Sequence, residues 1–260
     1  MRRIMLTNIL WLSLVWIAVM PVAIANTMAI KINDIKWPPF FFPKLEGQYL
    51  GLGKELLSYC LNGETYRLDY LNLPVKRTHL YMKSGQLDIA VYSHKKSREN
   101  FVLYSKEPIF ISEYGFVSVK TDQVTIEKIE DLYKYKFGNL SGIAHTPEVL
   151  KIIEEKRLHD EVTEGYDIDS MFGQMLTSPP RFQVMANSKE TFKWRAKQLG
   201  IADEVRVHPF TVAKKPYYLT VSKASNNIDN KKVFLENIDK CLVSAKQSGK
   251  YQEIASKYGL

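Results

Sequence analysis

Apolar and polar positions along the first part of the chain follow two different periods in short blocks. Strands are predicted where apolar residues recur at every second position or form short runs, and helices where they recur every three or four positions. The predicted strands are 29–33, 66–71 and 88–92, and the predicted helices between them are 51–61 and 77–85. This order of strand, helix, strand, helix and strand is typical of a layered α/β unit.

A second α/β unit is predicted after a strand at 114–119 and a polar stretch at 120–128. Its predicted elements are strands at 135–139 and 182–186, a helix that begins at Pro147, and helices at 168–177 and 189–199. Lys214-Lys215-Pro216 is predicted to break the pattern before a strand at 217–222. Two helices, 228–246 and 248–257, then close the chain without strands of their own.

The closing helices pack most simply against the first unit. Lobe 1 is then predicted to comprise 26–118 and 213–260, and lobe 2 to comprise 119–212. The chain would cross between the lobes twice, and two such crossovers suit a cleft that closes around a ligand by hinge motion.

The N-terminus has the pattern of a secretory signal peptide, residues 1–25. Arg2 and Arg3 precede an apolar run at 9–20, and Ala23-Ile24-Ala25 forms a small-residue cleavage site. The apolar run is short for a membrane span, which needs about 20 residues, so cleavage after Ala25 is favoured over an anchor. We expect a soluble protein, and a bacterial periplasm fits best.

Basic residues outnumber acidic ones, 36 Lys and Arg against 28 Asp and Glu, which gives a formal charge of +8. Two of the basic residues are in the predicted signal peptide.

Cys60 and Cys241, the two cysteines of the chain, both fall in predicted helices that could belong to one lobe. In an oxidising compartment they are predicted to form a disulfide, and two buried thiols are the alternative.

Four motifs, in this order along the chain, resemble those of the family 3 extracellular solute-binding proteins. They are Trp37-Pro38-Pro39-Phe40, Ser84-Gly85-Gln86-Leu87-Asp88, Ser97-Arg98 followed by Tyr104-Ser105, and Ser248-Gly249-Lys250-Tyr251 followed by Lys257-Tyr258-Gly259. The resemblance implies a two-lobed type II periplasmic-binding-protein fold, with each lobe a layered α/β sheet and two crossovers forming a hinge. It also implies binding of a small anionic or amino-acid-like solute for an ABC importer, without a cofactor, by a monomer.

The resemblance assigns ligand-binding positions in the first lobe. Arg98 matches an Arg that forks onto a ligand carboxylate, and Ser93 matches a hydroxyl that donates to the same group. The alternative for Arg98 is a solvated ion pair with Glu99. Asp34 and Trp37 match cleft positions where an acceptor and an aromatic face meet the ligand. The alternatives are that Asp34 forms a turn and that Trp37 is a core aromatic. Arg77 resembles a further Arg that faces the cleft, and the alternative is a solvated side chain at the start of a helix.

In the second lobe the chain matches only part of the family pattern. Ser141 and Gly142 match a loop whose backbone N–H groups meet an anion, but Ile143 stands where Thr is usual. Ser188 falls where the resemblance expects the Asp that binds an α-ammonium. An ammonium would then lack a strong partner unless Asp34 or Asp169 supplied one. A dicarboxylate, a modified amino acid or a small peptide-like acid would each fit.

Other kinds of chemistry find less support in the residues. The histidines have no short metal-ligand spacing, and no nucleophile or phosphate-loop motif occurs, so no metal, cofactor or enzymatic activity is expected. The pairs Lys95-Lys96 and Lys214-Lys215 lack interleaved aromatics, so they are interpreted as solvated surface or as facing a membrane partner, and not as nucleic-acid sites. Two alternatives share the fold: a ligand sensor for a membrane receptor, and a cyclohexadienyl dehydratase-like enzyme with Glu190 or Glu164 as the general acid.

Overall fold

The computed structural model describes residues 28–43, 49–61, 66–143 and 145–260. The predicted signal peptide, residues 1–25, lies outside the described residues. The strands are β1 (Met28–Asn33), β2 (Tyr66–Leu71), β3 (Ile89–Ser93), β4 (Val102–Val119), β5 (Phe137–Leu140), β6 (Val162–Gly165), β7 (Val184–Ser188) and β8 (Val205–Ser222). The helices are α1 (Leu52–Cys60), α2 (Val75–Ser84), α3 (Pro147–Arg157), α4 (Ile168–Met175), α5 (Lys189–Gln198), α6 (Lys231–Gln247) and α7 (Lys250–Ser256), with short 3₁₀ turns η1 (Lys96–Arg98) and η2 (Ile129–Lys134).

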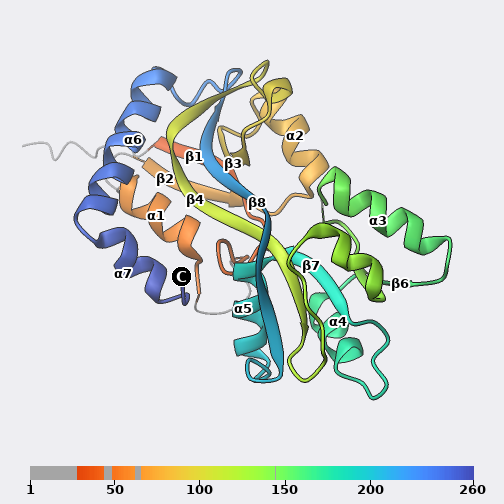
Figure 1. Cartoon of the computed structure of the whole chain (residues 1–260). Coiled ribbons are helices and arrows are strands. Elements are labelled where there is room, and N and C mark those ends of the chain that lie inside the picture. Colours follow the sequence, from red (N-terminus) through yellow and green to blue (C-terminus); the bar gives the residue numbers. More distant parts are fainter. Residues whose placement is uncertain (1–27, 44–48, 62–65, 144) are drawn as a thin grey trace, which may run out of the picture.

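The strands form one curled mixed sheet in the order β2-β1-β3-β8-β4-β7-β5-β6. Strands β4 and β8 are each 18 residues long and run antiparallel through the middle of the molecule, where they join the two ends of the sheet (Figure 1). We call β2, β1 and β3, with the parts of β8 and β4 beside them, the first half of the sheet. We call β7, β5 and β6, with the parts of β4 and β8 beside them, the second half.

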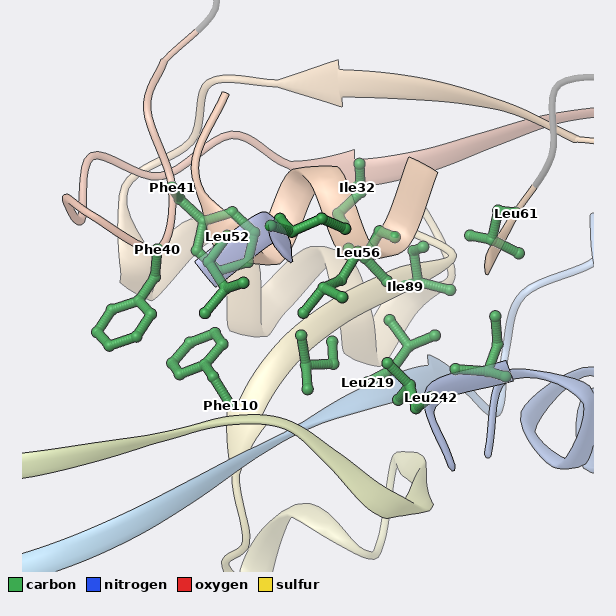
Figure 2. Packing of buried hydrophobic residues seen from close by; sticks show 14 of the residues in the cluster. Ile32, Phe40, Phe41, Leu52, Leu56, Leu61, Ile89, Phe110, Leu219 and Leu242 are labelled. Carbon is green, nitrogen blue, oxygen red and sulfur yellow. The ribbon is translucent and has the colours of Figure 1, made fainter. Parts of the chain in front are cut away.

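Helices cover both faces of the first half. Helices α1, α6 and α7 gather on one side of the strands and α2 lies on the other (Figure 1). Alternation along β3 explains this, because Ile89 packs with the larger cluster and Ala90 and Tyr92 pack on the opposite face with Met82 of α2. Figure 2 shows the larger cluster, in which side chains from α1 meet those of the strands and of α6; the labelled members are Ile32, Phe40, Phe41, Leu52, Leu56, Leu61, Ile89, Phe110, Leu219 and Leu242.

The second half repeats the same layering with its own cores. Phe116, Phe137 and Val184 pack on one face beneath α3, and Val117 and Met185 pack on the other face with α4 and α5. Helix α5 also contacts the first half, since Trp194 is buried in the larger cluster there. Within the described residues, four separate cores thus hold two layered units on one sheet.

The predicted disulfide is confirmed. Cys60 of α1 and Cys241 of α6 are bonded, with their Cα atoms 5.6 Å apart and a separation of 181 positions in sequence. The bond ties the C-terminal helices to the first half of the sheet.

The predicted break at Lys214-Lys215-Pro216 is wrong, because β8 runs through this segment without interruption. Strand β3 pairs with β8 only as far as Tyr217, so among the described strands β4 alone is paired with β8 at Pro216. A proline lacks an N–H to donate, and it is tolerated where one side of a strand is open. The predicted lobe boundaries, at 118–119 and 212–213, fall at the end of β4 and inside β8, and they stay predictions.

Candidate functional site

A cavity of about 420 Å³ lies between the two halves of the sheet. The first half contributes the segment after β1, the start of α2, and β3 with the turn that follows it; the second half contributes the loop at 142–143 and the end of β7. The residues that line the cavity and carry polar, charged or aromatic side chains are Asn33, Lys36, Trp37, Phe41, Thr78, His79, Tyr92, Ser93, Lys95, Arg98, Ser112, Tyr114, Asn187, Ser188, Lys215 and Tyr217.

The register of the sheet builds the floor of this cavity. Ser93 is paired with Tyr217 across β3 and β8, Lys215 with Ser112 across β8 and β4, and Tyr114 with Ser188 across β4 and β7. Side chains two residues apart on a strand share a face, so these residues point into the cavity from four neighbouring strands. The two long strands therefore carry residues of the site as well as joining the halves.

Arg98 is half-buried at the first-half end of the cavity. Its Nη1 donates to the carbonyl of Ser93 at 2.8 Å, and its guanidinium carbon lies 4.6 Å from the ring centroid of Tyr92. Glu99, the ion-pair partner considered for Arg98, has its Oε1 within hydrogen-bond distance of Nε2 of His94, at 2.7 Å. The Ser93 carbonyl and the Tyr92 ring thus fix the guanidinium, and its remaining N–H groups can meet an anion.

Trp37 also lines the cavity and is half-buried. Its ring makes edge contacts with Phe40 at 5.0 Å, Phe110 at 5.4 Å and Tyr217 at 4.7 Å between centroids. The ring therefore packs on core aromatics and also lines the cavity, and its role as an aromatic face for a ligand stays a prediction.

Gly142 and Ser188 reach the cavity from the second half. Ser188 is also the N-cap of α5, where its Oγ accepts from the N–H of Thr191 at 3.2 Å and donates to Oε2 of Glu190 at 2.7 Å. Glu190 in turn accepts from the N–H of Glu113 on β4 at 3.0 Å. The carboxylate nearest to the position of the expected Asp is therefore occupied by hydrogen bonds within the fold.

The structure places the other predicted ligand contacts outside the cavity lining. Asp34 is buried, 5% exposed, in an ion pair with Lys54. Arg77 is exposed on α2, and Ser141 is exposed with its N–H donating to Gly165 at 2.8 Å. Asp169, considered as a partner for an ammonium, accepts from Nε of Arg195 at 2.9 Å.

A hydrogen-bond chain behind Tyr114 was not foreseen from the sequence. Nδ2 of Asn139 donates to Glu164 at 2.7 Å, so its Oδ1 accepts from Nε2 of His145, also at 2.7 Å. His145 then accepts the Tyr114 hydroxyl proton at Nδ1. Burial lowers the pKa of His145 to about 4 and raises that of Tyr114, which keeps both groups neutral. Tyr114 thus presents hydroxyl lone pairs, and not its proton, to the cavity.

The charge of the cavity lining is positive. Lys36, His79, Lys95, Arg98 and Lys215 line it, and no Asp or Glu is found among the described residues that do so. Burial lowers the pKa of His79, whose Nδ1 lies 2.9 Å from the Tyr92 hydroxyl, so the lasting charge comes from the Lys and Arg side chains. Such a lining favours an anion and disfavours a ligand whose only charge is an ammonium or guanidinium.

Glu164 and Glu190, the candidates for a general acid, are both absent from the cavity lining as far as the described residues show it. Glu164 binds Asn139 and Arg157, and Glu190 binds the backbone of β4. Among the described residues, no group of three or more His, Cys, Asp or Glu side chains is placed to hold a metal ion. No helix in the described ranges combines the length and the apolar character that crossing a bilayer requires.

Solved structures of binding proteins share this fold. The probable amino-acid ABC transporter extracellular-binding protein ytmK from Bacillus subtilis is 15% identical, with a TM-score of 0.72 over 90% of this chain and 98% of that one. A mutant of ArgBP from T. maritima is 17% identical, with a TM-score of 0.65 over 89% and 95%. A histidine kinase sensor domain with similarity to periplasmic binding proteins is 13% identical, with a TM-score of 0.64 over 91% and 97%.

The curled mixed sheet and its helices are therefore those of a type II periplasmic binding protein, as the sequence resemblance predicted. The chain belongs to the bacterial extracellular solute-binding proteins, family 3, whose model matches residues 30–260. Members of this family are extracellular proteins that bind solutes.

Proposed function

We propose that this protein captures a small anionic or amino-acid-like solute in the cavity and delivers it to an ABC importer. The observation that carries the proposal is the cavity between the two halves of the sheet, positively charged and lined from both sides. Its ligand contacts would be Arg98 and Ser93 from the first half and Gly142 and Ser188 from the second, with Trp37 against the body of the solute.

The proposal includes a periplasmic location, with cleavage after Ala25, and no enzymatic activity. The Cys60–Cys241 disulfide supports such a location, because disulfides persist in oxidising compartments. We further propose that lobe 1, residues 26–118 and 213–260, and lobe 2, residues 119–212, close over the solute by bending of β4 and β8.

A screen of the secreted protein by thermal shift, against amino acids, dicarboxylates and short peptides, tests the proposal. A ligand at about 100 times its dissociation constant adds about 2.7 kcal/mol of stability, which such a screen detects. Failure of every compound to shift the midpoint would count against a solute-binding role.

Variants of Arg98 then test the binding mode. Arg98→Ala is expected to weaken binding by at least about 30-fold, since loss of one partner of a desolvated charge pair costs about 2 kcal/mol or more. Arg98→Lys keeps the charge but loses the paired N–H donors of the guanidinium, so its affinity should lie between those of Arg98→Ala and wild type. Lys96→Ala removes an exposed charge from the same turn and serves as the control. Equal affinity of Arg98→Ala and Lys96→Ala would refute the assignment.

Sensing for a membrane receptor is the second candidate, and the similarity to a histidine kinase sensor domain favours it. Deletion of the protein separates the two roles, with uptake of the labelled solute as the readout. Lost uptake supports delivery to an importer. Normal uptake, together with loss of a transcriptional response to the solute, supports sensing.

A further inference from the structure

Two adjacent lysines on β8 point in opposite directions. Lys215 lines the cavity beside Ser112, with which it is paired across β8 and β4. Lys214 points away, with its side chain 64% exposed and its Nζ 2.6 Å from Oε1 of Glu113. Alternation along the strand separates the roles of two residues that the sequence alone presents as one surface pair.

Among the described residues, no carboxylate pairs with Lys215. Within the described residues, its Nζ forms neither an ion pair nor a hydrogen bond, and none of them brings an Asp or Glu to the cavity lining. Glu113, on the strand next to it, is paired with Lys214 and lies 3.7 Å from Nζ of Lys189. Burying an ammonium in a cavity that closes costs free energy unless an anion pairs with it. A ligand with an anionic group would supply that partner for Lys215.

The distance from Lys215 to Arg98 suits a small molecule with two charges. Arg98 is held on the carbonyl of Ser93, Ser93 is paired with Tyr217, and Lys215 is two residues from Tyr217 on the same strand. With a rise of about 3.4 Å per residue and strands about 4.8 Å apart, the backbone of Ser93, which holds the Arg98 guanidinium, and the backbone of Lys215 are about 8 Å apart. Arg and Lys side chains reaching inward from such anchors can hold the two ends of a short diacid.

We propose that Lys215 binds a second anionic group of the solute, so that the ligand is a small dicarboxylate without a cationic group. This inference rests on the proposed function and narrows it. Arg98 takes one carboxylate, Lys215 takes the other, and Trp37 and Tyr217 contact the carbon skeleton between them. The described lining offers no carboxylate to an α-ammonium, because the neighbouring carboxylates are engaged within the fold.

The test compares diacids with their own monoamides, which keep the shape but carry one charge. Succinate, glutarate, adipate and phthalate are titrated calorimetrically against succinamate, glutaramate, adipamate and phthalamate, using the secreted protein with its disulfide intact. At least one diacid is expected to bind ten-fold or more tightly than its monoamide. Lys215→Met should abolish that preference, and Lys214→Met, the matched control, should retain it.

Each outcome decides between this inference and the proposed function. Equal affinity for diacid and monoamide, or a preference that survives in Lys215→Met, overturns the role of Lys215. Binding of amino acids or monoacids without any of the diacids also overturns it, but leaves the solute-binding function standing. Failure of every acid and amino acid to bind contradicts the proposed function itself.

Discussion

Asp34 and Lys54 form a buried ion pair, and breaking it is expected to destabilise the fold strongly. Both side chains are almost fully buried, with 6% of Asp34 and 3% of Lys54 exposed. Nζ of Lys54 also donates to the carbonyl of Phe42 and lies 4.5 Å from the ring centroid of Tyr70. Removing one partner leaves the other charge in a site that water cannot reach.

The expected magnitude follows from this burial. Asp34→Asn and Lys54→Met should each lower the free energy of unfolding by about 3–5 kcal/mol, the usual cost of removing one partner of a buried ion pair. The double variant should lose much less than the sum, because neither charge then remains. Urea denaturation of the four proteins gives the coupling energy, which we expect to exceed about 2 kcal/mol.

The exposed pair Lys151–Glu155 on α3 provides the matched control. Its atoms are 3.8 Å apart and its side chains are 73% and 45% exposed, so its coupling should be about 0.3–0.5 kcal/mol. A coupling for Asp34 and Lys54 no larger than that would refute the reasoning. The double variant also tests the sequence-based role of Asp34, since it should bind the solute like wild type if the carboxylate only balances Lys54.

Two further predictions concern stability. Replacing Cys60 and Cys241 with Ala should lower the free energy of unfolding by about 5 kcal/mol, because the bond closes a loop of 181 residues; a loss under about 1 kcal/mol in urea denaturation would contradict this. His208, 3% exposed and 2.9 Å from the Ser118 hydroxyl, has its pKa lowered to about 4 by burial. Since its folded pKa is below the unfolded value of about 6.5, its contribution is present above that pH and is lost as the pH falls toward 4, by up to about 3 kcal/mol. The destabilisation between pH 7 and 5 should be smaller in His208→Asn, and an unchanged slope would contradict the assignment.

The layered organisation could be predicted from the sequence because it depends on local periodicity. Ile30 and Ile32 alternate on β1 as apolar residues of a half-buried strand do, and the apolar residues of α1 recur at helical spacing. Strand β8 could not be predicted whole, since Pro216 and its neighbouring lysines resemble a loop. Only the position of β3, which ends beside Tyr217, shows why a proline fits there.

The site could be predicted only where spacing along the chain carries the information. Ser93 ends β3 and Arg98 follows it five residues later, and the structure brings both to the cavity. Asp34 looks equally suitable in sequence, but its partner Lys54 arrives from a helix 20 residues later. The sequence favours a solvated or partner-facing surface for Lys215, because a lysine pair is usually solvated. The proposed role of Lys215 depends on the alternation of side chains along β8. A predicted break at Lys214-Lys215-Pro216 places Lys215 outside a strand, so this alternation cannot be read from the sequence.

Ser188 connects these observations to the charge of the ligand. The resemblance expects an Asp at this position, and here a serine lines the cavity instead, while the nearby carboxylate of Glu190 accepts hydrogen bonds from β4 and from Ser188 itself. Ser188→Asp should therefore weaken the binding of an anion and allow the binding of an α-amino acid. Because Oγ of Ser188 lies 2.7 Å from Oε2 of Glu190, the substitution belongs in a Glu190→Gln background, where two carboxylates do not meet.

Asp remains a good N-cap for α5, so the helix should tolerate the change. Ser188→Asn in the same background keeps the shape and the cap without the charge, and it isolates the electrostatic effect. Calorimetry with the best acid from the screen should show binding at least ten-fold weaker in the Asp variant than in the Asn variant. Equal affinity in the two variants would mean that position 188 does not face the bound anion, and that the positive lining alone does not select the ligand.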